Sequence, residues 1–184
     1  MLLPVAKTLG AEAAFANANA AIQVLGGAGY VRDWPVERLL RDCRVFSIYE
    51  GTTAIQGLDL LLRRVLGEAG APVLRGLLDQ LAPASGIAEA VLGSAAALAE
   101  AAPRLREAAA VPFLQLLALA CADGLLRRAG HQAGPFAARY TALAAFHGAE
   151  VGERAALLAA RCRRGDLDTA FDAVFLDEDK GAPP

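Results

Sequence analysis

The spacing of apolar and polar residues along the first part of the chain predicts two helices separated by a turn. Residues 5–25 form a long run of apolar and small residues that ends at the glycine pair 26–27, and glycine commonly terminates helices. A loop is expected over 26–34. Residues 35–46 then place apolar side chains on one helical face and charged ones nearer the other. Asp33 is the expected N-cap of this second helix.

A third helix is predicted over residues 54–66, after a short break in the apolar pattern. Either Thr52 or Thr53 can cap its start, and Gly67 marks its end. Two arginines in the last turn would stabilise the helix, because positive charge interacts favourably with the negative C-terminal end of the helix dipole.

The rest of the chain reads as an antiparallel helical bundle. The segment 67–72 is the expected linker, so that the chain divides into domains 1–67 and 68–184. Pro112 is expected to kink or break its helix. Proline and glycine punctuation predicts helices over residues 72–82, 86–102, 103–130, 135–164 and 168–176, with a frayed tail beyond them.

Composition agrees with an all-α fold. Hydrophobic residues make up 55% of the chain but aromatic residues only 6%, and much of the apolar content is alanine, the strongest helix former. A β-sandwich or barrel is therefore disfavoured. The net charge of −2, from 18 basic and 20 acidic residues without a basic patch, disfavours a nucleic-acid partner.

The sequence pattern also favours a cytoplasmic protein without a membrane span. Lys7 and Glu12 interrupt the first apolar run, which argues against a signal peptide. Asp123 and Arg127 follow the best candidate for a membrane span. Three widely spaced cysteines and two histidines fit a reducing compartment and predict neither a disulfide framework nor a metal site.

Two short stretches are candidates for chemistry. The sequence GGAG at 26–29 is not G-x-G-x-x-G and follows a helix, so a helix-ending turn is the simpler interpretation, although its amides could meet a phosphate. Glu50 stands between two helices, beside Gly51 and before a capped helix start. A general base is one interpretation of this carboxylate, and a capping or solvated glutamate is the other. On pattern alone Tyr49 is a packing residue.

Three motifs, in order, carry a resemblance to a known family. They are Q-x-x-G-G-x-G-Y at 23–30, P-V-E-R-x-x-R-D at 35–42 and I-Y-E-G-T at 48–52. Over residues 21–66 the chain resembles the C-terminal helical region of flavin-dependent acyl-CoA dehydrogenases. Residues 72–176 resemble, more weakly, the extra helical domain of longer bacterial members.

The resemblance implies a catalytic role for Glu50, as the base that removes the α-proton of an acyl-CoA while hydride passes to flavin. It assigns Tyr49 and Gly51 to the substrate. FAD is the implied cofactor, with contacts from two short segments: Gln23, Val24, Leu25, Gly26 and Gly27, which would meet the adenosine-diphosphate part of FAD in a neighbouring subunit, and Thr52, Thr53 and Ala54. The implied partners are the acyl-CoA, an electron-transfer flavoprotein as electron acceptor, and further copies of the chain in a homo-oligomer.

The chain departs from the family pattern in two residues and in extent. Ala54 stands where a polar residue is common, and Gly57 where an arginine is frequent. A complete enzyme of this family also has an N-terminal helical domain and a middle β-domain, which 184 residues cannot contain. The expectation is therefore a C-terminal piece of a longer or split enzyme, with doubtful activity alone. The alternative is a non-catalytic helical module for interaction or oligomerisation.

Overall fold

In the computed structural model the described residues are 1–82, 85–132 and 134–164. The expected helix 168–176 and the tail lie outside them. Within these ranges every regular element is helical and no strand occurs, which confirms the all-α fold. The elements are α1 (Leu2–Leu25), α2 (Gly27–Tyr30), α3 (Val36–Cys43), η1 (Arg44–Ser47), α4 (Thr53–Leu58), η2 (Asp59–Val65), α5 (Gly70–Leu81), α6 (Gly86–Ala99), α7 (Pro103–His131) and α8 (Ala137–Arg163).

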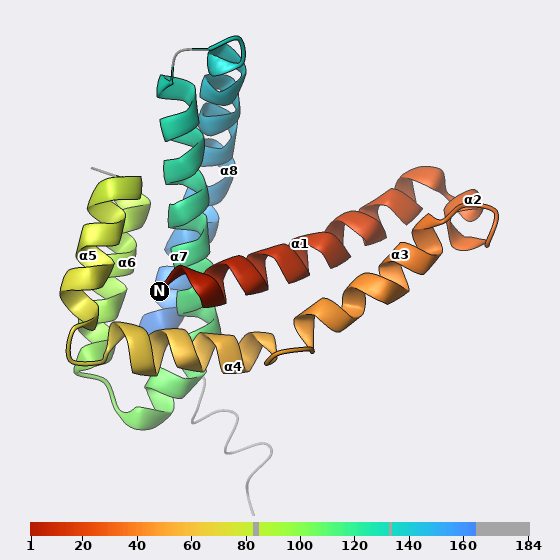
Figure 1. The fold of residues 1–184 in the computed structure, drawn as a ribbon. Helices are drawn as coiled ribbons and strands as arrows, with labels where there is room; N and C mark the ends of the chain where they lie inside the picture. Colours follow the sequence, from red (N-terminus) through yellow and green to blue (C-terminus); the bar gives the residue numbers. More distant parts are fainter. Residues whose placement is uncertain (83–84, 133, 165–184) are drawn as a thin grey trace, which may run out of the picture.

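An arm and a bundle make up the described structure (Figure 1). The long helix α1 starts beside the bundle and runs out to the short helix α2, and α3 returns along it. Helix α4 and its continuation η2 lead back to the bundle, where α7 and α8 lie side by side. The far end of the arm, around α2, therefore packs mainly on α1 and α3, whereas the start of α1 also packs on the bundle.

The hydrophobic core spans both parts of the chain. Leu60 and Leu61 of η2 are fully buried and belong to the same cluster as Phe113 in the middle of α7. The cluster also receives Val5 from the start of α1. Although 1–67 and 68–184 are predicted as separate domains, their apolar side chains pack together, and the boundary itself stays a prediction.

Gly57 allows α4 to lie directly on α7. A Cβ at this position would come within 2.9 Å of the carbonyl oxygen of Ala110 and within 3.1 Å of the backbone nitrogen of Val111. A Cβ atom is normally farther than this from backbone atoms of another helix. Only glycine therefore fits at this position without movement of α4 or α7. An arginine is frequent at this position in the family that the sequence resembles. The close packing of α4 on α7 explains why this chain has glycine instead.

Helix boundaries follow the predictions with local differences. The helix predicted over 54–66 is one helical segment, but its second half, η2, has the wide π-helical turn. The carboxylate of Asp59 pairs with Arg63 at 3.1 Å and with Arg64 at 2.6 Å in this turn. A π turn brings residues five apart onto the same face, as the pairing with Arg64 requires.

Two expectations about turns are wrong, and a third is displaced by a few residues. Asp33 is not the N-cap of α3: Pro35 occupies that position, and Glu37 supplies the acidic charge of the first turn. The expected loop 26–34 contains the helical turn α2. The predicted linker 67–72 is shorter than expected, because α5 already begins at Gly70, where a Cβ would strike the carbonyl oxygen of Val65.

Helix α7 runs from Pro103 to His131 with Pro112 inside it, so of the predicted kink or break at this proline the break does not occur. Among the described residues it is the one helix with the length and apolarity of a membrane span. Of its most apolar 18-residue window, 61% is buried inside the protein, and α7 contacts both α6 and α8. This burial is typical of the central helix of a bundle.

Candidate functional site

The turn between η1 and α4 has an unusual backbone. Glu50 has a φ of 56° and is the single non-glycine residue with positive φ in the described part of the chain, and Gly51 follows with a φ of 94°. A left-handed conformation costs a non-glycine residue about 1–2 kcal/mol. Residues in such conformations cluster at functional sites because the surrounding structure holds them there.

Side chains from α1 and α4 hold this turn in place. The Nζ of Lys7 donates a hydrogen bond of 2.5 Å to the carbonyl oxygen of Gly51. The Nε2 of Gln56 donates to the carbonyl oxygen of Glu50 at 2.8 Å. With both carbonyl groups engaged, the backbone that follows the Cα of Glu50 is held in place.

The start of α4 is tied to α1 as well. Thr52 is the N-cap, with its hydroxyl oxygen accepting a hydrogen bond of 3.4 Å from the Ile55 N–H, which settles the choice between Thr52 and Thr53. Thr53 instead donates to the Glu12 carboxylate at 2.6 Å across 41 residues of sequence. Lys7 and Glu12 lie about one and a half turns apart on α1. They hold Gly51 and Thr53, on either side of the N-cap Thr52.

Glu50 lies at the edge of a small hollow rather than in a closed pocket. The hollow has a volume of about 270 Å³ and is lined by Lys7, Gly10, Ala11, Phe46, Tyr49 and Glu50. Glu50 is exposed, and Tyr49 is 65% exposed. The described residues thus supply one wall of a site, and Tyr49 is not buried as a packing residue would be.

The second candidate segment, residues 23–27, lies at the far end of α1. Gln23, Val24, Gly26 and Gly27 are exposed, Leu25 is half-buried, and Gly26 has a φ of 59°. A Cβ at Gly26 or Gly27 would meet nothing within 4 Å, so the backbone here is open to a ligand. With 1.5 Å of rise per residue, this segment lies roughly 20 Å along α1 from Glu12. The fold does not bring it to Glu50.

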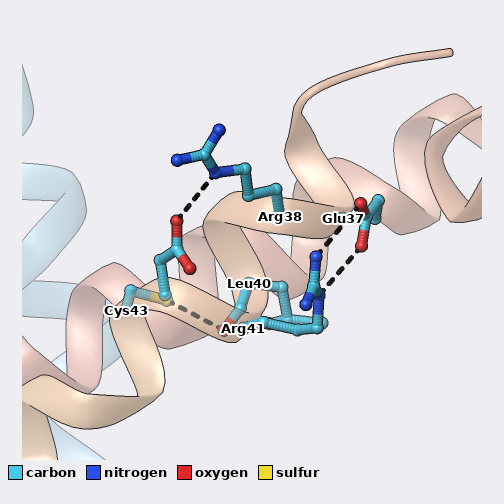
Figure 2. Close-up of polar contacts among 6 residues, drawn as sticks. Glu37, Arg38, Leu40, Arg41 and Cys43 are labelled. Carbon is cyan, nitrogen blue, oxygen red and sulfur yellow. Dashed lines mark hydrogen bonds and ion pairs between the residues drawn. The ribbon is translucent and has the colours of Figure 1, made fainter. Parts of the chain in front are cut away.

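Helix α3 carries the charged face that the pattern predicted (Figure 2). The Nε of Arg38 lies 3.2 Å from Asp42, and the Nε of Arg41 lies 3.1 Å from Glu37, both pairs being one turn apart on an exposed surface. Such pairs are worth a few tenths of a kcal/mol. Arg44 differs, because it stacks over the ring of Phe15 with 5.4 Å to the ring centre.

A buried polar cluster in the bundle was not predicted. Asp123 is fully buried, and its Oδ2 accepts hydrogen bonds from Arg127 at 2.8 Å and Ser85 at 3.4 Å. Its Oδ1 lies 4.0 Å from the Nδ1 of His147 on α8. In the sequence, Asp123 and Arg127 stand four residues apart in an apolar run. This spacing could have predicted that the two side chains pair on one face of the helix. The cluster links α6, α7 and α8 and is remote in sequence from Glu50.

Comparison with known proteins gives a family match for the first part of the chain. Residues 1–66 match the family described as acyl-CoA dehydrogenase, C-terminal domain. A 3-methylmercaptopropionyl-CoA dehydrogenase of Ruegeria pomeroyi is 38% identical over 124 residues, which is 66% of this chain and 21% of that protein. Because this match exceeds 66 residues, it extends into the appended bundle.

Two further relatives match shorter stretches of the chain. A broad-specificity linear acyl-CoA dehydrogenase of Mycobacterium tuberculosis is 43% identical over 70 residues, 38% of this chain and 12% of that protein. An acyl-CoA dehydrogenase of Bacillus subtilis is 50% identical over 62 residues, 34% of this chain and 16% of that protein. The chain thus spans at most about a fifth of the length of these relatives. Residues 1–66 of the chain therefore match the C-terminal domain of the acyl-CoA dehydrogenase family, which confirms the resemblance that the three motifs predicted.

Proposed function

We propose that this chain forms the C-terminal part of an FAD-dependent acyl-CoA dehydrogenase, in which Glu50 is the catalytic base. The observation that carries the proposal is the left-handed backbone of Glu50 within a segment that matches the family. Glycine adopts this backbone without strain, so the glutamate costs stability here, as strained residues at functional sites do.

The geometry of the turn suits removal of a proton from a bound thioester. Lys7 and Gln56 engage the carbonyl groups of Gly51 and Glu50, so the carboxylate and the N–H groups remain for a ligand that approaches the turn. Glu50 would accept the α-proton at a carboxylate oxygen, and Gly51, without a side chain, would let the thioester end approach the backbone.

The residues present fit one edge of an FAD site. The segment 23–27 offers open backbone at two glycines, and Thr52 keeps its side chain at the start of α4, whereas Ala54 presents only a methyl group. When bound, FAD would accept the hydride from the β-carbon of the acyl chain. Because cofactor pockets enclose most of their ligand, these edges require further domains, and we expect the chain alone to bind FAD weakly.

Association with further chains is also part of the proposal. Large apolar side chains on the arm are exposed, among them Val24 at 86% and Tyr30 at 80%. Exposed apolar surface of this kind marks an interaction site, which suits a homo-oligomer in which segment 23–27 meets the cofactor of a neighbouring subunit. The same surface would serve a non-catalytic interaction module. An electron-transfer flavoprotein would reoxidise the assembled enzyme.

The test is a graft. Residues 1–66 would replace the matching segment of the Bacillus subtilis acyl-CoA dehydrogenase, with which the chain shares 50% identity over 62 residues. The proposal expects a yellow flavoprotein that reduces its flavin on addition of acyl-CoA. A graft that folds and holds FAD but leaves its flavin oxidised would contradict a catalytic role and favour the interaction module.

A further inference from the structure

A second and larger cavity lies in the bundle, between η2, α5, α6 and the start of α7. Its volume is about 540 Å³, which falls within the usual range for small-molecule sites. It shares no lining residue with the hollow at Glu50. The residues that line it are Val65, Leu66, Gly67, Ala71, Pro72, Leu74, Arg75, Leu92, Ala95, Ala96, Ala99 and Arg106.

The cavity wall is largely aliphatic, and small residues keep it open. Leu74 and Val65 at the wall are buried parts of the core, so the floor is fixed. On the α6 side, Ala95, Ala96 and Ala99 project only methyl groups into the space. Leucines at these positions would fill the cavity, as they do elsewhere in the bundle. The shape therefore suits a flexible hydrocarbon chain.

The charge in this cavity has one sign. Two arginines line it and no acidic residue does. Arg106 is partly engaged, because its Nε donates to the carbonyl oxygen of Leu98 at 2.9 Å and its Nη2 to that of Ala99 at 2.6 Å. Arg75 has no hydrogen-bond or ion-pair partner among the residues that the structure describes. An unpaired guanidinium beside an apolar cavity is suited to a carboxylate, which it can bind through two parallel hydrogen bonds.

We propose that this cavity binds a small amphipathic carboxylate, a free fatty acid of medium chain length, with its hydrocarbon chain along α6 and its head group at Arg75. A neutral head group would leave the guanidinium without its partner, and a cationic one would be repelled by two like charges. The site therefore selects by the sign of the head group, whereas an apolar surface alone would select by chain length.

Isothermal titration calorimetry of the full chain with octanoate, octanol and octylamine separates these cases. We expect octanoate to bind with a Kd below about 1 mM and the two other compounds at least about tenfold more weakly. Amide chemical-shift changes should map to α5 and α6. Equal binding of all three compounds, absence of octanoate binding, or shift changes confined to the arm would each overturn the proposal.

Two variant pairs locate the site. Arg75→Gln should weaken octanoate binding about five- to tenfold, the loss expected for a charged hydrogen bond that is partly exposed. Arg128→Gln, at an exposed site remote from the cavity lining, should change nothing. Ala96→Phe should block the cavity, whereas Ala97→Phe, on the same helix but outside the lining, should leave binding intact. Equal effects within either pair would contradict the assignment.

Discussion

Replacing Gly57 with alanine tests whether the family segment and the appended bundle are packed as one structure. Without tertiary contacts, alanine would stabilise α4, since glycine in a helix interior is about 1 kcal/mol less favourable than alanine. In the structure the new methyl group would lie 2.9 Å from the Ala110 carbonyl oxygen and 3.1 Å from the Val111 nitrogen. These are backbone atoms of α7, which cannot move aside as a flexible side chain would.

The packing cost should outweigh the gain in helix propensity. Overpacking of a well-filled interior costs about 1–3 kcal/mol, so that Gly57→Ala should lower the free energy of unfolding by about 1–2 kcal/mol. Gly93→Ala is the matched control, because Gly93 is also inside a helix but a Cβ there meets nothing within 4 Å. This control should raise stability by about 0.5–1 kcal/mol.

Urea unfolding followed by circular dichroism measures both changes, with the slope of each transition as a check on two-state behaviour. The two variants should move the midpoint in opposite directions. If Gly57→Ala stabilised the protein as much as Gly93→Ala does, α4 would not rest on α7 and the joint core would be refuted.

Three further expectations follow from particular contacts. Glu50→Gly should raise the free energy of unfolding by about 1 kcal/mol by removing left-handed strain, and a loss of stability would mean that the turn is not strained. Thr52→Ala should lower it by about 0.5–1 kcal/mol, since the cap bond to the Ile55 N–H is long at 3.4 Å; an unchanged melting temperature would argue against this cap. Burial raises the pKa of Cys121 and Cys162 from 9.0 to about 11. Unfolded thiols ionise first as pH rises, so stability should fall between about pH 9 and 11, and a double replacement of both cysteines by alanine should flatten this decline.

Helices were the most predictable part of the structure. Alanine-rich runs and glycine or proline punctuation placed α1, α7 and α8 within a few residues of their ends, because helix propensity and termination are local properties. Residue type limited the N-cap of α4 to Thr52 or Thr53, and the structure selects Thr52. Asp33 shows the limit, since the N-cap position of α3 falls at Pro35, two residues after this suitable capping residue.

Features that depend on contacts between distant segments were not predictable. The left-handed Glu50 is held by the hydrogen bond between Lys7 and Gly51, and this bond joins residues 44 apart in the sequence, which no local pattern reveals. Gly57 was noticed as a departure from a family pattern, but only its packing on α7 explains it. The candidate base at Glu50 came from the three ordered motifs, and its assignment stays a prediction.

The most direct test of the central claim is rapid mixing of the grafted enzyme with its best acyl-CoA substrate, with and without Glu50→Gln. Glutamine keeps the shape of the side chain but cannot accept the α-proton. Asp42→Asn, whose side chain is 59% exposed on α3, is the control, because it also replaces a carboxylate by an amide. The account predicts unchanged FAD content in all three proteins and bleaching of the oxidised flavin about 10²–10⁴-fold more slowly in Glu50→Gln alone. Bleaching of the Glu50→Gln protein at the parent rate would mean that another group takes the proton, and would contradict the role of Glu50.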